Sequence, residues 1–141
     1  MAHATQTAED LVIEFFLRYS KAFQTLNPDA IPPFYHEPSL FISPQGITSL
    51  PTRSDVASFF RDLMSNLRAQ DYRTSNFAGL RATSLSPNLA VVTGVGTWRR
   101  TDGSELRRFG LTYTLWGTGD AWEIAAAVVH DLILQPGIDA P

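Results

Sequence analysis

The sequence predicts an α+β protein in which a curved, mostly antiparallel sheet wraps around N-terminal helices to form a cone. Two observations predict this class. Apolar residues recur at helical spacing in two segments of the first half, and the last third alternates in the manner of strands joined by tight turns. Because each helix carries one apolar stripe, both helices must cover the same sheet face. The open end of such a cone is a natural place for a ligand pocket.

The composition of the chain is that of one ordinary globular domain. The 141 residues carry a net charge of −3 without acidic or basic blocks, which argues against nucleic acid or a membrane surface as a partner. The chain has no cysteine, so it has no disulfide and no thiolate metal site, and we expect a cytoplasmic protein. Residues 1–135 are expected to form a single domain, and residues 136–141 a flexible tail.

Two segments are predicted to be amphipathic helices. Thr7 with Asp10, and Thr52 with Asp55, resemble capping boxes in which Asp replaces the usual Glu. Each is followed by a single apolar stripe. The predicted helices span about residues 8–26 and 53–70.

Strands are predicted for most of the remaining chain. In order, we expect a helical turn at 29–35 and strands at 39–43, 46–50, 72–85, 89–100, 105–116 and 121–131. Gly79 is expected to bend the strand that contains it. The pair Asp102-Gly103 is a strong hairpin signal, and Gly117 to Asp120 are expected to form the four-residue final turn.

That final turn determines which side chains of the last two strands point inward. Pairing back from Trp116 opposite Ala121 places one apolar set on the inner face. The expected inward pairs are Leu115–Trp122, Tyr113–Ile124, Leu111–Ala126, Phe109–Val128 and Arg107–His130. The opposite face carries small, mostly uncharged residues, and we expect it to form a homodimer through Thr112, Ala125, Ala127 and Val129.

Several segments resemble the nuclear transport factor 2-like superfamily, and within it the SnoaL-like proteins. The resemblance lies in residues 15–23 (FFLRYSKAF), 34–46 (FYHEPSLFISPQG), 91–98 (VVTGVGTW) and 120–124 (DAWEI). It implies a cystatin-like cone over roughly residues 7–134. The superfamily includes isomerases, dehydratases, cyclases, epoxide hydrolases and binding proteins, so the resemblance implies a fold and leaves the activity open.

The enzyme patterns of this superfamily match only in part. Ketosteroid isomerases resemble the chain at Tyr19, which occupies the place of an oxyanion donor. Their general-base Asp falls at Ser43, and their second donor falls near Leu111 or Thr112, so two of the three roles are missing. The acids of limonene epoxide hydrolases are also missing. Scytalone-type dehydratases use Tyr and His, which Tyr19, Tyr113 and His130 could imitate.

Candidate site residues follow from these inward positions. The candidate catalytic residues are His130, Tyr19 and Tyr113, and the candidate ligand-binding residues are Arg107, Trp98, Phe41, Phe59, Leu111 and Ala126. His130 suits proton transfer because histidine titrates near neutral pH, although a hydrogen-bonded histidine at a strand end is the plainer alternative. Gly94 and Gly96 are expected to leave empty volume beside Trp98. With only three histidines, no metal and no cofactor are expected.

Two functional hypotheses remain open from the sequence. One is a cofactor-free acid/base isomerase, cyclase or dehydratase that acts on a small apolar or aromatic molecule, with Arg107 as its anchor. The other is a non-catalytic domain that uses the cone for ligand binding or the sheet for dimerisation. The residues of the chain do not decide between them.

Overall fold

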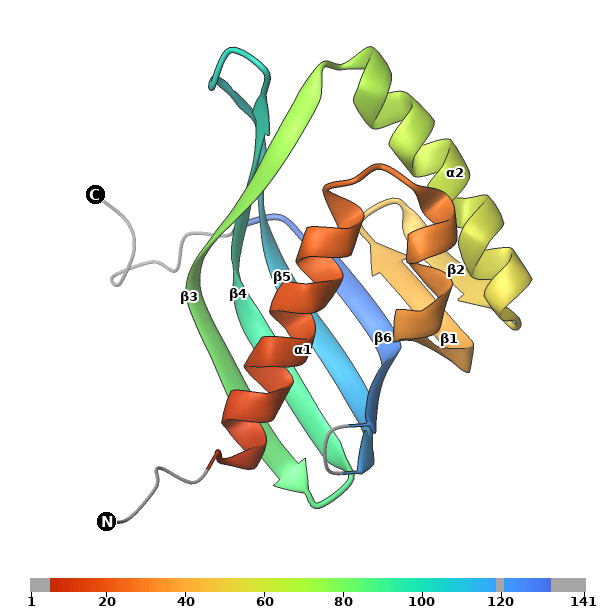
Figure 1. The fold of residues 1–141 in the computed structure, drawn as a ribbon, viewed down its shortest axis with the longest axis vertical. Coiled ribbons are helices and arrows are strands. Elements are labelled where there is room, and N and C mark those ends of the chain that lie inside the picture. The colour runs from red at the N-terminus through yellow and green to blue at the C-terminus, as the bar shows by residue number, and fades with distance from the viewer. Residues whose placement is uncertain (1–5, 119–120, 133–141) are drawn as a thin grey trace.

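The computed structural model describes residues 6–118 and 121–132, which form two α-helices, two short 3₁₀ helices and one six-stranded sheet. The elements are α1 (Ala8–Phe23), η1 (Pro28–Ala30), η2 (Pro32–Phe34), β1 (Tyr35–Ser43), β2 (Gly46–Leu50), α2 (Arg53–Ala69), β3 (Tyr72–Ser86), β4 (Leu89–Arg100), β5 (Glu105–Thr118) and β6 (Ala121–His130). Figure 1 shows the sheet curving past α1 and α2, so the predicted α+β cone is confirmed. The predicted tail, residues 136–141, lies outside the described residues.

The strand order in the sheet is β2-β1-β6-β5-β4-β3. Every neighbouring pair is antiparallel except β1 and β6, which run parallel. This arrangement puts the last strand in the middle of the sheet and brings the β1–β2 hairpin beside it (Figure 1). The hairpin and α2 therefore face β4 and β5 across the hollow of the cone.

Both helices begin at the predicted capping boxes. The Thr7 hydroxyl accepts from the Asp10 backbone N–H at 3.1 Å, and the Thr7 N–H donates to the Asp10 carboxylate at 3.2 Å. The same reciprocal pair joins Thr52 and Asp55. These bonds satisfy N–H groups that the first helical turn leaves without a partner.

The core lies between the apolar stripes of the helices and the concave face of the sheet. Val12, Phe16 and Tyr19 of α1 are buried there, as are Phe60 and Met64 of α2. Full burial of a large apolar side chain contributes about 1.5–3 kcal/mol, so the two stripes hold the helices on the sheet.

Arg53 ties the start of α2 to the sheet. Its backbone N–H donates to Glu37 at 2.6 Å, its Nη1 donates to the same carboxylate at 3.2 Å, and its Nη2 pairs with Glu123 of β6. A cation at a helix N-terminus is unfavourable by itself. Here two carboxylates offset that cost, so Arg53 holds α2 against β1 and β6 and does not line the cone.

The pairing of β5 with β6 differs from the prediction. Thr118 pairs with Ala121, so the final turn has two residues instead of four, and both lie outside the described part of the chain. Thr114 then pairs with Ala126 and Leu115 with Ile124, which leaves Ala125 as an extra residue. An extra residue of this kind is a β-bulge, and it exchanges the inner and outer faces of the strand that follows.

Because of the bulge, several residues of β6 lie on a different face of the sheet from the one predicted. Trp122 and Ile124, which precede it, point inward as predicted, whereas Ala127 and Val129 are buried instead of outward. The positions alternating with them are Ala126, Val128 and His130, and these lie on the outer face. Phe109, Leu111, Tyr113 and Leu115 of β5 are buried as predicted. His130 is opposite Gly110, so its predicted meeting with Arg107 is wrong.

Glycines shape the two remaining predicted features. Gly79 has a φ of 63° within a register shift between Ala78 and Arg81, which confirms the bend in β3. Gly103 has a φ of 88° in the β4–β5 hairpin, where the Asp102 carboxylate accepts from the Ser104 N–H at 2.9 Å. Both positions use the left-handed region that glycine tolerates without strain.

Candidate ligand-binding site

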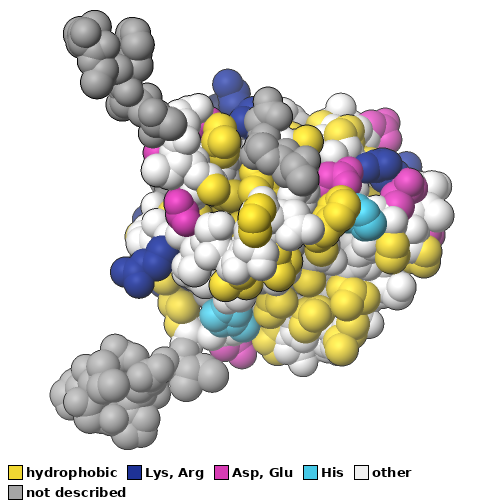
Figure 2. All heavy atoms as spheres, turned by 90° about the horizontal axis from the view of Figure 1, so that it is seen from below, with side chains coloured by type: hydrophobic (Ala, Val, Ile, Leu, Met, Phe, Trp, Pro, Cys, Tyr) yellow, Lys and Arg dark blue, Asp and Glu magenta, His cyan; other side chains and the backbone are white. Residues whose placement is uncertain are grey.

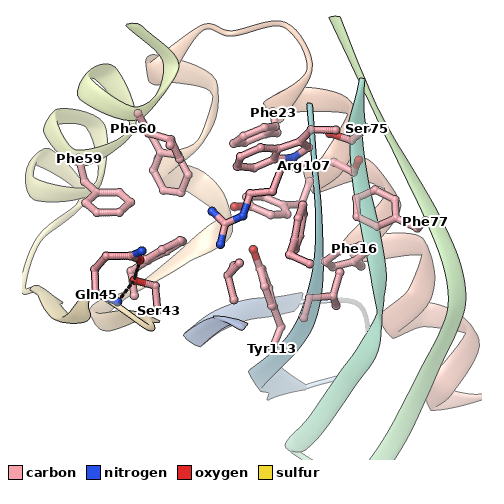
Figure 3. Close-up of a pocket in the computed structure, with 18 residues that line it drawn as sticks. Phe16, Phe23, Ser43, Gln45, Phe59, Phe60, Ser75, Phe77, Arg107 and Tyr113 are labelled. Carbon is pink, nitrogen blue, oxygen red and sulfur yellow. Dashed lines mark hydrogen bonds between the residues drawn. The ribbon is translucent and has the colours of Figure 1, made fainter. Parts of the chain in front are cut away.

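A cavity of about 230 Å³ lies inside the cone, between the helices, the β1–β2 hairpin and the concave face of the sheet (Figure 3). Ten of its 18 lining residues are aromatic. They are Phe16, Tyr19, Phe23, Phe41, Phe59, Phe60, Phe77, Trp98, Phe109 and Tyr113. An apolar cavity of about 150 Å³ holds benzene, so this one has room for an aromatic ring with a short substituent.

The aromatic walls of the cavity are packed against one another. Trp98 stacks on Phe23 with ring centroids 5.9 Å apart and meets the edge of Phe109 at 5.0 Å. Across the cavity, Phe41 and Phe59 lie 4.7 Å apart. Because each ring is held by other rings, the walls present a preformed apolar surface to a flat ligand.

The two glycines of β4 do not leave the empty volume that was expected of them. A Cβ on Gly96 would lie 2.5 Å from Cζ of Phe109, so the Phe109 ring already lies across that position. A Cβ on Gly94 would lie 2.8 Å from the side chain of Leu80. The Phe109 ring, which forms part of the cavity wall, therefore packs over Gly96, and the cavity lies beyond that ring.

Two tyrosine hydroxyls reach the cavity, and a third lies behind them. The hydroxyls of Tyr19 and Tyr35 are 2.9 Å apart, and Tyr19 and Tyr113 line the cavity. Burial raises the pKa of Tyr19 and of Tyr35 well above the usual value, and it raises the pKa of Tyr113 to about 12 against a hydrogen bond with Tyr19. All three hydroxyls are therefore protonated at neutral pH and act as hydrogen-bonding groups, not as bases.

Arg107 is the one charged residue among the described residues that line the cavity. Figure 3 shows its guanidinium directed into the cavity from β5. It lies 5.9 Å from the centre of the Phe109 ring, and no described carboxylate pairs with it. Its neighbour Arg108, on the opposite face of the strand, pairs with Glu105 at 2.9 Å.

Most of the predicted site residues come together in this cavity. Tyr19, Tyr113, Arg107, Trp98, Phe41, Phe59 and Leu111 all line it. Their part in binding or catalysis stays a prediction. Ala126 and His130 do not line it, because the bulge at Ala125 turns both to the outer face.

His130 has its own setting on that outer face. Its Nε2 is 3.3 Å from the Thr112 hydroxyl, and its Nδ1 is 3.1 Å from the Asp131 carbonyl oxygen. Its ring lies over Gly110, where a Cβ would come within 2.2 Å of the ring. His130 is therefore a hydrogen-bonded strand-end residue, which is the plainer of the two readings the sequence allowed.

Other lining residues were not among the predicted site residues. Phe60 and Phe77 could have been identified from the helical stripe and the strand alternation. Val129 could not, since the bulge reverses its face. Ser43 and Gln45 come from the β1–β2 hairpin, where the sequence carries no periodic signal of burial.

Two further kinds of feature are absent from the described residues. No group of three or more His, Asp or Glu side chains in residues 6–118 and 121–132 converges as a metal site would require. Within the same part of the chain, neither α-helix combines the length and the hydropathy needed to cross a bilayer.

Comparison with known protein families matches residues 8–132 to the family described as NTF2-like protein (DUF6841). The chain belongs to this family. The resemblance seen in the sequence is thereby confirmed at the level of the NTF2-like superfamily. No curated protein matches the NTF2-like chain.

Solved structures show the same fold. An NTF2-like protein with a cystatin-like fold from Novosphingobium aromaticivorans has a TM-score of 0.71 at 15% identity, over 90% of this chain and 83% of that one. An NTF2-like protein of unknown function from Shewanella oneidensis MR-1 has a TM-score of 0.69 at 16% identity, over 86% and 98%. A domain of unknown function with a cystatin-like fold from Nostoc punctiforme has a TM-score of 0.70 at 18% identity, over 92% and 80%. At these identities the similarity establishes the fold alone.

Proposed function

We propose that this NTF2-like domain is a SnoaL-like binding protein that holds a small aromatic molecule in its cone. The observation that carries the proposal is the cavity of about 230 Å³ with ten aromatic lining residues. Pockets of this kind are apolar, largely preformed and equipped with a few polar groups that orient the ligand. The hydroxyls of Tyr19 and Tyr113 and the guanidinium of Arg107 are such groups.

Binding is favoured over acid/base catalysis by the residues around the cavity. A general base needs a pKa near the working pH and direct access to the substrate. The described lining contains no Asp, Glu, His or Lys, and burial keeps the hydroxyl of Tyr113 protonated with a pKa of about 12. Ser43 lines the cavity where ketosteroid isomerases carry their base, and His130 lies outside it. The acid/base alternative therefore lacks a base among the described lining residues.

Calorimetry with a filled-cavity variant tests the proposal. Val129→Phe adds a ring inside the cavity, whereas Val128→Phe adds the same bulk on the outer face. We expect the wild type and Val128→Phe to bind monocyclic aromatic probes such as benzyl alcohol and phenylacetate, and Val129→Phe to lose that binding while it stays folded. If none of the probes binds the wild type, or if Val129→Phe binds them as well as the wild type does, the proposal is wrong.

We also propose that the domain forms a homodimer through the outer face of the sheet. Ile47, Ile42 and Val128 form a row across β2, β1 and β6, and that row continues to Thr112 of β5. Ile47 is 71% exposed in the single chain, and Figure 2 shows hydrophobic side chains gathered on part of the surface. Apolar side chains that gather on the surface of a single chain are typical of an interaction site.

The bulge changes the residues of this proposed interface. Thr112 and Ala125 remain from the predicted set, while Ala126 and Val128 replace Ala127 and Val129. Leu40, which is 38% exposed and pairs with Ala126, extends the same face.

A further inference from the structure

We infer that the occupant of the cone is a monocyclic aromatic carboxylate whose acid group is held by Arg107. This inference rests on the proposed binding function and adds the charge of the ligand to it. Three observations on separate elements support it: the setting of Arg107, the hydrogen bonding of the β1–β2 hairpin and the size of the cavity.

The setting of Arg107, half-buried and without a described carboxylate partner, favours an anion in the cavity. Its guanidinium enters a cavity whose other described lining residues are apolar or neutral, and the described chain supplies no carboxylate to it. A cation brought among apolar groups is costly unless an opposite charge and hydrogen-bond acceptors meet it. The planar guanidinium fork matches a carboxylate with two parallel N–H···O bonds.

The β1–β2 hairpin adds a second donor at the same cavity. The Ser43 hydroxyl accepts from the Gln45 backbone N–H at 3.2 Å, so it donates its own proton to Gln45 Oε1 at 2.9 Å. This arrangement turns Oε1 toward Ser43 and leaves the Nε2 amino group of Gln45 as a donor. Figure 3 shows the Arg107 guanidinium directed toward the side where Ser43 and Gln45 lie. The Gln45 amide and the Arg107 guanidinium are therefore two donors that a ligand with oxygen acceptors would meet at this cavity.

The cavity size limits what else the ligand carries. An apolar cavity of about 150 Å³ binds benzene, so a cavity of about 230 Å³ accommodates one such ring and a side arm of a few atoms. The ring fits among Phe59, Phe60 and Trp98, and the arm carries the acid to Arg107.

Affinity should not depend on pH near neutrality. The described lining has no histidine or acidic residue, and these are the side chains that change charge between acidic and neutral pH. The ligand carboxylate is itself ionised near neutral pH. We therefore expect the affinity for an aromatic carboxylate to be constant from about pH 6 to about pH 9.

Calorimetry with phenylacetate and phenylacetamide tests the inference, because the two probes have the same shape and differ in charge. We expect the wild type to bind phenylacetate about tenfold or more tightly than phenylacetamide, the effect of one charge-assisted bidentate contact. Arg107→Gln should bind both probes equally. Arg107→Lys should keep part of the preference, because it keeps the charge without the fork.

Arg108→Gln is the matched control. It removes the same charge one residue away, from an exposed pair with Glu105, so it should leave the preference unchanged within about twofold. If the wild type binds both probes equally, or if Arg107→Gln keeps the preference for phenylacetate, the carboxylate inference is overturned while the proposed binding function stands. If the wild type binds neither probe at millimolar concentrations, both proposals fail.

Discussion

The four tyrosines of the chain are all buried, and their ionisation links the interior to pH. Burial raises the pKa of Tyr72 and of Tyr113 from 10 to about 12, and it also raises the pKa of Tyr19 and of Tyr35 well above the usual value. The unfolded chain loses these protons near pH 10, before the folded chain does. The stabilisation is therefore fully present below pH 10 and is lost as the pH rises toward 12.

This difference predicts an alkaline loss of stability. The free energy of unfolding in urea should be constant at neutral pH and should fall between pH 10 and pH 12. Ultraviolet absorbance of the folded protein should show no tyrosinate below pH 10. Tyr113→Phe should make the fall shallower. Tyrosinate absorbance that appears in the folded protein below pH 10 would contradict the burial of these hydroxyls.

At the scale of the element, β6 determines which residues meet the cavity. The bulge at Ala125 separates an outward Ala126 from a buried Ala127, whose side chain is 0% exposed. Ala127→Lys should therefore reduce the free energy of unfolding by about 3 kcal/mol or more, because it buries an unpaired charge. Ala126→Lys should cost the fold of the single chain less than about 1 kcal/mol, since in the monomer its side chain can extend along the surface into water. Urea titration of the two variants measures the difference, and a larger loss for Ala126→Lys would refute the register.

The contrast between the helix starts and β6 shows what the sequence could predict. A capping box joins two residues three positions apart, so Thr7–Asp10 and Thr52–Asp55 were recognisable locally. Strand register depends on turn length and on bulges, which the local pattern does not determine. The run Ala125-Ala126-Ala127-Val128-Val129 has no alternation of large apolar and polar residues, so the change of face within it left no signal.

The residues of the site were likewise predictable only where the local sequence pattern determines which way a side chain points. Four cavity residues of β5 and α1 were predicted correctly, because the alternation of the strand and the apolar stripe of the helix are clear in the sequence. They are Tyr113, Leu111, Arg107 and Tyr19. His130 was misplaced because it follows the bulge. Gln45 was missed because its position depends on how the β1–β2 hairpin sits against the rest of the cone.

At the scale of the whole molecule, the outer sheet face predicts a dimer. Val128→Glu places a charge in the middle of the apolar row that includes Ile42 and Ile47. Sedimentation should show a dimer for the wild type at micromolar concentration and a monomer for this variant, because an unpaired charge in an interface is costly. Arg108→Gln serves as a control at an exposed position of β5. A monomeric wild type would show that this face is not an interface.

The central claim is that the hollow of the cone, and not the outer sheet face, receives an aromatic ligand. Methyl NMR of the protein titrated with phenylacetate tests it directly, because an aromatic ring shifts the methyl resonances next to it. We expect the largest shifts at Leu63, Leu111 and Val129, which line the cavity, and small shifts at Val95 and Val128 on the outer face. Shifts confined to Val95 and Val128, with Leu111 and Val129 unchanged, would contradict the claim.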